Sequence, residues 1–88
     1  MQATVTIELP AQHVTSMIAS AEGVVEEIDS ARCLARIGGE TPAAVAGVLT
    51  RLDADFTVEG PPEMTRYLAG VAKRFRRGSA AVTQSPAM

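Results

Sequence analysis

Apolar residues alternate with polar ones at the start of the chain and then recur at helical spacing. Val5, Ile7 and Leu9 alternate with threonine and glutamate, a pattern that predicts a half-buried strand. Pro10 ends that strand and suits the first turn of a helix, which is predicted to run to about residue 21. The expected buried stripe of this helix consists of Val14, Met17, Ile18 and Ala21.

Two further strand-like runs, residues 24–29 and 32–37, predict a hairpin. The core side of its second strand is expected to hold Cys33, Ala35 and Ile37. The outward positions of the central strands are Thr4, Thr6, Glu8, Arg32, Leu34 and Arg36. An ion pair between Glu27 and Arg32 is expected across the hairpin.

A second helix is predicted after a glycine break. Gly38-Gly39 interrupts the strand, and Thr41-Pro42 then combines a hydroxyl cap with a proline at the first helical position. The expected buried stripe consists of Val45, Val48, Leu49 and Leu52. Gly47 within this helix either permits a close backbone approach or is a tolerated glycine on a solvent face.

The last third of the chain predicts a strand and then a long basic helix. The strand covers residues 56–59, with Phe56 and Val58 facing inward, and the helix starts near Glu63. The expected buried stripe of the helix is Met64, Tyr67, Leu68, Val71 and Phe75. Its opposite face holds Arg66, Gly70, Lys73 and Arg77. Residues 78–88 are small and polar and predict a disordered tail.

The order of these elements is β-α-β-β-α-β followed by one helix. This order predicts an α+β fold of the ferredoxin-like split βαβ type, with a four-stranded antiparallel sheet and an extra C-terminal helix. Residues 1–77 then form a single domain.

Composition suggests that this domain needs a partner. Apolar residues make up 47% of the chain, but they are mostly alanine and valine, with two phenylalanines, one tyrosine and no tryptophan. Small side chains bury little area, so we expect a homodimer or a larger parent protein to add stability. The net charge of −2 argues against a nucleic-acid-binding module, although basic residues gather in 66–77 and acidic ones in 22–29.

Few residues suggest catalysis or metal binding. His13 and Cys33 are single representatives of their types and lie on different predicted elements, so we expect no catalytic site, metal or cofactor. Cys33 is interpreted as a small core residue, and a lone cysteine fits a reducing, cytoplasmic compartment. No stretch is apolar enough for a membrane span. Gly38 and Gly39, ahead of a helix start, are a candidate loop for an anion or small ligand.

The segment Leu52–Arg77 carries a family resemblance. Leu52 precedes a small-acidic strand (DADFTV), the sequence EGPPEM follows, and a helix with Arg66, Leu68 and terminal basic residues comes last. This segment resembles the C-terminal extension, or WCX domain, of WYL-domain transcriptional regulators. The resemblance extends over about residues 3–77 in the layout of strands and helices. The chain has no DNA-binding helices and no tryptophan for the Trp-Tyr-Leu run of a WYL domain.

The resemblance implies a regulatory and dimerisation domain of a bacterial transcription factor, of which this chain is a fragment or a stand-alone remnant. DNA would then be bound only through domains absent from this chain. The candidate interaction residues are Arg66, Lys73 and Arg77 on the last helix, with the outward strand positions as a second surface. The alternative is a small-molecule-sensing, amino-acid-binding type of ferredoxin-like domain that uses the Gly38-Gly39 loop and a dimer groove.

Overall fold

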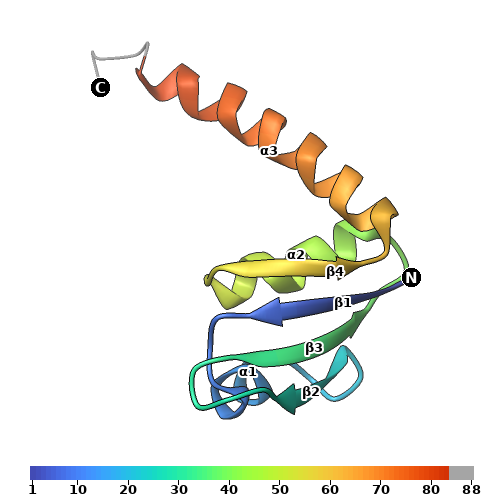
Figure 1. Ribbon diagram of the computed structural model, residues 1–88. Coiled ribbons are helices and arrows are strands. Elements are labelled where there is room, and N and C mark those ends of the chain that lie inside the picture. Colours follow the sequence, from blue (N-terminus) through green and yellow to red (C-terminus); the bar gives the residue numbers. More distant parts are fainter. Residues whose placement is uncertain (84–88) are drawn as a thin grey trace.

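Four strands form one antiparallel sheet, with helices α1 and α2 on one side of it (Figure 1). A computed structural model describes residues 1–83 of the chain, with side chains as far as residue 80. The strands are β1 (Gln2–Ile7), β2 (Gly23–Glu27), β3 (Cys33–Gly38) and β4 (Phe56–Gly60). The helices are α1 (Ala11–Met17), α2 (Pro42–Leu52) and α3 (Pro62–Thr83).

The strand order in the sheet is β2-β3-β1-β4. β3 pairs antiparallel with both β1 and β2, so β1 and β2 run parallel to each other with β3 between them. β4 pairs antiparallel with the other side of β1 and forms one edge of the sheet. The predicted α+β class with a four-stranded antiparallel sheet is confirmed.

The core lies between the sheet and the two helices. Alternate residues of the central strands are fully buried, and the register places Val5 opposite Ala35 and Ile7 opposite Cys33. The predicted inward positions of β3 are thus confirmed. The helices add Val14 from α1, Met64 from α3, and the predicted stripe of α2: Val45, Val48, Leu49 and Leu52.

Helix α1 is shorter than the sequence predicts. It ends at Met17, and Ile18 already has an extended backbone. The Glu22 carboxylate accepts a hydrogen bond from the Ala19 amide, and the Glu22 amide donates to the Ala19 carbonyl, which closes a turn in place of another helical turn. Of the expected stripe, only Val14 is fully buried, and Ala21 is exposed. The predicted end at residue 21 was therefore wrong.

The predicted ion pair across the hairpin is also wrong. The strand register places Glu27 opposite Cys33, and the Arg32 side chain pairs with Asp29 in the turn. The pair that does join the two strands is formed by Arg36 and Glu26, at 3.0 Å.

Gly47 and Gly23 differ in what surrounds them. A Cβ at Gly47 would meet nothing within 4 Å, so this exposed glycine makes no close backbone approach. A Cβ at Gly23 would lie 2.6 Å from the Arg36 carbonyl oxygen on the neighbouring strand. Of the two interpretations of Gly47, the structure therefore supports a tolerated glycine on a solvent face and not a close backbone approach.

We expect Gly47→Ala to raise the free energy of unfolding by roughly 0.5–1 kcal/mol, because alanine loses less backbone entropy in a helix. Gly23→Ala is the matched comparison. It should lower the free energy of unfolding, because the backbones of β2 and β3 would have to move apart. Urea unfolding of both variants tests this pair. A destabilised Gly47→Ala protein would contradict the open space around the Gly47 Cα atom.

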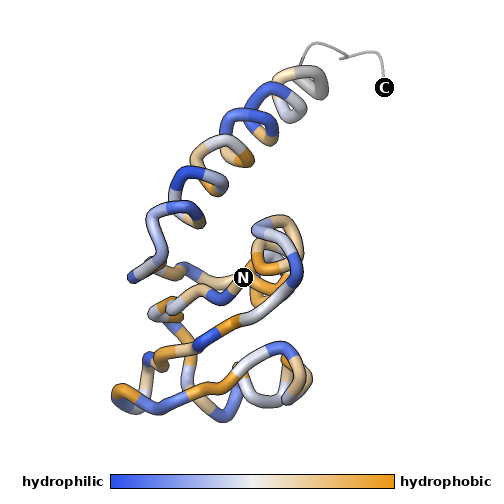
Figure 2. The backbone as a smooth tube through the Cα atoms, turned by 90° about the vertical axis from the view of Figure 1, so that its right-hand side faces the viewer, coloured by the Kyte–Doolittle hydropathy of each residue, from blue (hydrophilic) through white to orange (hydrophobic). Residues whose placement is uncertain are grey.

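Helix α3 is longer and less covered than predicted. It continues to Thr83, so residues 78–83 are helical and do not belong to a disordered tail; the rest of that predicted tail, residues 84–88, lies outside the described residues. Met64 is fully buried, Tyr67, Leu68 and Val71 are partly buried, and Phe75 is 67% exposed. Both views show the helix leaving the body of the domain (Figure 1, Figure 2). The prediction that Phe75 is buried was wrong, because no other element extends far enough to cover it.

Candidate functional site

The described residues show no cluster of side chains typical of a metal centre. No group of three or more His, Cys, Asp or Glu side chains within residues 1–80 is placed to hold a metal ion. His13 is exposed on α1, while Cys33 is fully buried in the core, where burial raises the pKa of its thiol. A buried thiol with a raised pKa forms little of the reactive thiolate. Cys33 is therefore a core residue, as its alternation with apolar neighbours predicted.

The Gly38-Gly39 loop uses its amides within the chain. The Gly38 amide donates to the Glu22 carbonyl at 2.8 Å, and the Gly39 amide donates to the Met1 carbonyl at 3.0 Å. A Cβ at Gly39 would lie 2.8 Å from the Ala44 Cβ, so close packing against α2 accounts for this glycine. With both amides already bonded, the geometry does not support the hypothesis that Gly38 and Gly39 bind an anion.

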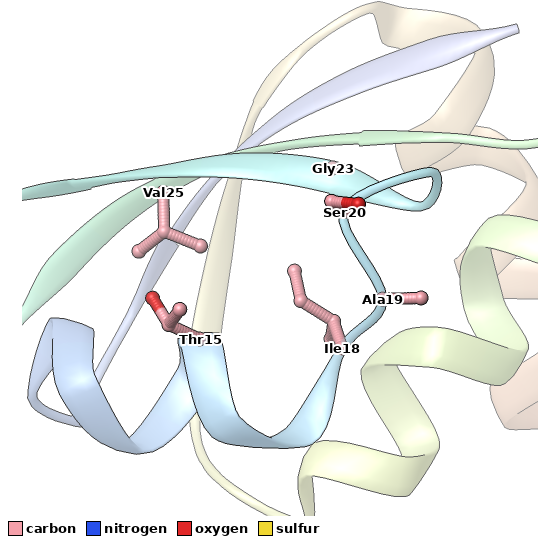
Figure 3. A pocket seen from close by; sticks show the side chains of 6 residues that line it. All are labelled: Thr15, Ile18, Ala19, Ser20, Gly23 and Val25. Atoms are coloured by element: carbon pink, nitrogen blue, oxygen red, sulfur yellow. The ribbon is translucent and has the colours of Figure 1, made fainter.

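A shallow hollow lies between the end of α1 and the edge strand β2. Its volume is about 260 Å³, and its lining residues are Thr15, Ile18, Ala19, Ser20, Gly23 and Val25. Thr15 and Ile18 point across it toward Val25 (Figure 3). The hollow lies where α1 ends at Met17 and the chain turns back toward β2. Its lining is mostly apolar and contains no charged side chain.

The three candidate interaction residues lie along one side of α3. Arg66, Lys73 and Arg77 are all exposed, and their spacing places them on the helix face opposite Met64, Val71 and Phe75. In the part of the chain that the structure describes, no α3 cation takes part in an ion pair. The structure thus brings these residues to one exposed face, as predicted, but shows nothing that they bind.

The apolar side of the same helix is a second free surface. Tyr67 and Leu68 pack against the core, but Val71 and Phe75 do not. Arg74 lies over the Tyr67 ring, with its Cζ 5.8 Å from the ring centroid, an arrangement in which the cation interacts with the ring face. Sequence reasoning assigned Phe75 to the core and therefore missed it as a contact residue. The apolar spacing revealed the side of the helix on which Phe75 lies, but not where the body of the domain ends.

Charge is divided between α3 and the rest of the domain. Residues 64–83 carry five basic and no acidic side chains, whereas residues 1–61 carry nine acidic and three basic ones. Those three basic residues are already paired: Arg32 with Asp29, Arg36 with Glu26, and Arg51 with Glu22. The body therefore presents carboxylates that are in no ion pair, and the projecting helix presents cationic side chains that are in no ion pair.

The sheet face away from the helices is the second surface expected from the sequence. Thr4, Thr6, Leu34 and Arg36 lie there, all half-buried. The Thr6 hydroxyl donates to the Glu59 carboxylate at 2.9 Å, and Val24 on the edge strand is 60% exposed. This face thus combines polar contacts, among them the Arg36–Glu26 ion pair, with one exposed apolar side chain at its edge.

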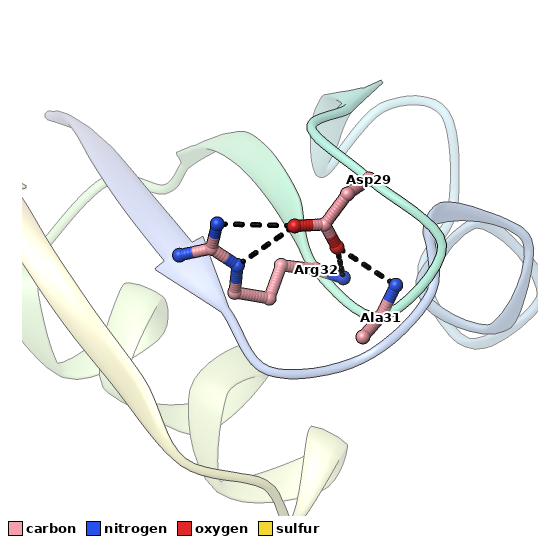
Figure 4. Close-up of polar contacts among 3 residues, drawn as sticks. All are labelled: Asp29, Ala31 and Arg32. Atoms are coloured by element: carbon pink, nitrogen blue, oxygen red, sulfur yellow. Dashed lines mark hydrogen bonds and ion pairs between the residues drawn. The ribbon is translucent and has the colours of Figure 1, made fainter.

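The turn of the β2–β3 hairpin is held by one carboxylate. Oδ1 of Asp29 accepts hydrogen bonds from the amides of Ala31 and Arg32 at 2.8 and 2.9 Å, and Oδ2 accepts two from the Arg32 guanidinium at 3.2 and 3.0 Å (Figure 4). The hydrogen bond from the Ala31 amide is the largest reason why the pKa of Asp29 lies below its ordinary value of 3.8, and the bonds from Arg32 lower the pKa further. The turn therefore depends on the ionised carboxylate.

We expect the stability that Asp29 contributes to be complete above its ordinary pKa and to be lost as the pH falls through its lowered one. Asp29→Asn should lower the melting temperature near pH 7 and flatten its decline in acid, because the amide offers one acceptor oxygen and no charge for Arg32. Melting curves between pH 2 and 7 test this. An identical acid dependence in the variant and the parent protein would contradict it.

In comparisons with protein-family models, curated proteins and solved structures, nothing matches this chain. Among the helices within residues 1–83, none combines the length and apolar character that crossing a membrane requires.

Proposed function

We propose that this protein is a non-catalytic regulatory and dimerisation domain that assembles through helix α3. The observation that carries the proposal is the apolar stripe of α3, which continues past the body of the domain and leaves Phe75 67% exposed. An exposed aromatic side chain on a projecting helix is unfavourable in water unless a second surface covers it. A contact between chains would also supply the apolar burial that a core of small side chains lacks.

The wider setting of the proposal follows the sequence resemblance. The layout of residues 3–77, and Leu52–Arg77 in particular, is similar to the WCX extension of WYL-domain transcriptional regulators. A ferredoxin-like split βαβ topology fits that resemblance, and the placement of β3 between the parallel strands β1 and β2 supports it. In this setting the chain is a cytoplasmic part of a longer regulator, and DNA is bound by other domains of that regulator.

A concentration series of amide hydrogen exchange tests the role of α3. We expect residues 71–77 to exchange rapidly in dilute protein and to become protected as the concentration rises, while core amides such as that of Ile37 stay unchanged. Contact between chains is the reason, because it covers a helix segment that otherwise packs against nothing. Exchange in residues 71–77 that does not depend on concentration would contradict the proposal.

A small-molecule-sensing domain is the second candidate, and the hollow between α1 and β2 is the observation that favours it. Its volume of about 260 Å³ lies just below the usual range of ligand sites, and its lining suits a small aliphatic group more than an anion. A panel of free amino acids in a thermal-shift assay tests it, since a ligand that binds only the native state raises the melting temperature. Flat melting temperatures across the panel would count against this candidate.

A further inference from the structure

The exposed aromatic residue of α3 stands among cations. Phe75 is 67% exposed, and Arg74 and Arg76 flank it in sequence. Lys73 lies two residues before it and Arg77 two residues after it. All four cations are exposed, and in the described part of the chain none of them is in an ion pair. We call Phe75 with its two neighbours Arg74 and Arg76 the basic aromatic segment; Lys73 and Arg77 lie on the opposite face of the helix.

A second exposed aromatic residue lies where acidic residues gather at the ends of β1 and β4. Phe56 begins the edge strand β4 and is 37% exposed. Asp55 precedes it, and the Glu8 amide donates to the Asp55 carbonyl at 2.9 Å, which holds the ends of β1 and β4 together. Asp53, two residues before Asp55, supplies the third carboxylate. Glu8, Asp53 and Asp55 are exposed, and no ion pair among the described residues includes them. We call Phe56 with these three carboxylates the acidic aromatic patch.

The two surfaces lie far apart on one chain. Phe56 is at the start of β4, whereas α3 begins at Pro62, just beyond the other end of that strand. Phe75 then lies about 20 Å further along the helix axis, at 1.5 Å per residue. The helix runs away from the sheet over this distance (Figure 1, Figure 2). In the structure, therefore, α3 does not bring its own Phe75 to its own Phe56.

We propose that the basic aromatic segment of one chain docks on the acidic aromatic patch of a second copy. This inference rests on the proposed dimerisation and names the surfaces that meet. Each chain carries both surfaces, so two copies related by a two-fold axis exchange helices reciprocally and close the assembly at two chains.

The chemistry of the two surfaces is complementary. The aromatic rings supply apolar area and pair favourably edge to face. The cations around one ring face the carboxylates around the other, which fixes the orientation of the contact and opposes a contact between two copies of the same surface. Because all these charges are exposed, added salt should weaken the dimer.

Charge reversal with mixing tests the inference on the full chain. The helix variant is Arg74→Glu with Arg76→Glu, and the patch variant is Glu8→Lys with Asp55→Lys. Asp53 is left unchanged because its backbone is left-handed, with φ of 53°. The matched control is Arg66→Glu with Arg77→Glu, which makes the same change of charge with both residues on the face opposite Phe75.

Each charge-reversed variant alone should dimerise at least about tenfold more weakly than the parent protein, because like charges then face each other at both contacts. An equimolar mixture of the two should restore dimerisation, since both contacts in the mixed dimer join opposite charges. The control should change the dissociation constant much less. Sedimentation velocity of the parent protein, the helix variant, the patch variant, their mixture and the control gives these dissociation constants. Circular dichroism shows that each variant is folded.

The outcomes separate this inference from the proposed function. A parent protein that stays monomeric at every concentration would overturn both. A parent dimer that neither variant weakens, or variants that stay monomeric after mixing, would overturn the docking surfaces alone. A control variant weakened as much as the helix variant would move the contact to the face that holds Arg66, Lys73 and Arg77.

Discussion

Replacing Phe75 with glutamate should abolish self-association and leave the folded monomer as stable as before. The side chain is 67% exposed and makes no contact with the core of its own chain. Substitutions at such positions usually change the free energy of unfolding by no more than about 0.5 kcal/mol. At an interface, however, the new carboxylate must lose water without gaining a partner, which is costly.

Sedimentation velocity and thermal unfolding of the Phe75→Glu protein measure the two effects separately. Ala69→Glu is a suitable control, because it places the same carboxylate on an exposed position about 120° around α3 from Phe75 and nearer the body of the domain. We expect the control to associate like the parent protein. A Phe75→Glu protein that still associates like the parent would show that this face of α3 is not the contact.

Replacing Met64 with alanine should cause the largest loss of stability among changes in α3, about 2–5 kcal/mol. Met64 is the only fully buried side chain among the described residues of that helix, and it joins the core cluster that the sheet and α2 form. Its removal leaves a cavity where α3 meets the body. For a domain whose total stability is on the order of 5–15 kcal/mol, this is a large fraction.

Urea unfolding of the Met64→Ala protein tests the role of this residue as the anchor of α3. Met64→Leu is the matched comparison, because it keeps the volume nearly constant and should cost less than about 1.5 kcal/mol. If alanine and leucine were tolerated equally, Met64 would not hold α3 to the domain, and the direction of the projecting helix would need another explanation.

The sequence predicted the sheet well because alternation and burial agree on the central strands. Cys33, Ala35 and Ile37 face the core as expected, and the order of helices and strands along the chain is that expected. The register of the hairpin was not predictable in the same way. Its turn lacks a standard two-residue signal, and Asp29 binds Arg32 locally, which removes Arg32 from the cross-strand partner that the pattern suggested.

The ends of helices were predicted less well than their faces. The spacing of Met17, Ile18 and Ala21 suggested one more turn of α1, but the Glu22 carboxylate closes a different turn there. At Gly78 the composition suggested disorder, yet α3 continues to Thr83, because extending an existing helix costs far less than starting one.

The candidate site shows what periodicity cannot reveal. A stripe at helical spacing identifies which side of α3 is apolar, but whether that side is covered depends on the length of the body that it faces. The core extends to Met64, Tyr67 and Leu68 and stops before Phe75. The sequence also could not show that the amides of Gly38 and Gly39 are already hydrogen-bonded, because their partners, Glu22 and Met1, lie far away in sequence.

The molar mass of the intact chain in solution decides whether α3 joins two copies of the protein. Light scattering over a wide range of protein concentration, at low and high salt, would give it. We predict a mass that rises from one chain to two as the concentration increases, with the transition shifted to higher concentration by salt. A mass of one chain at every concentration and salt level would contradict the account of α3 as an assembly element.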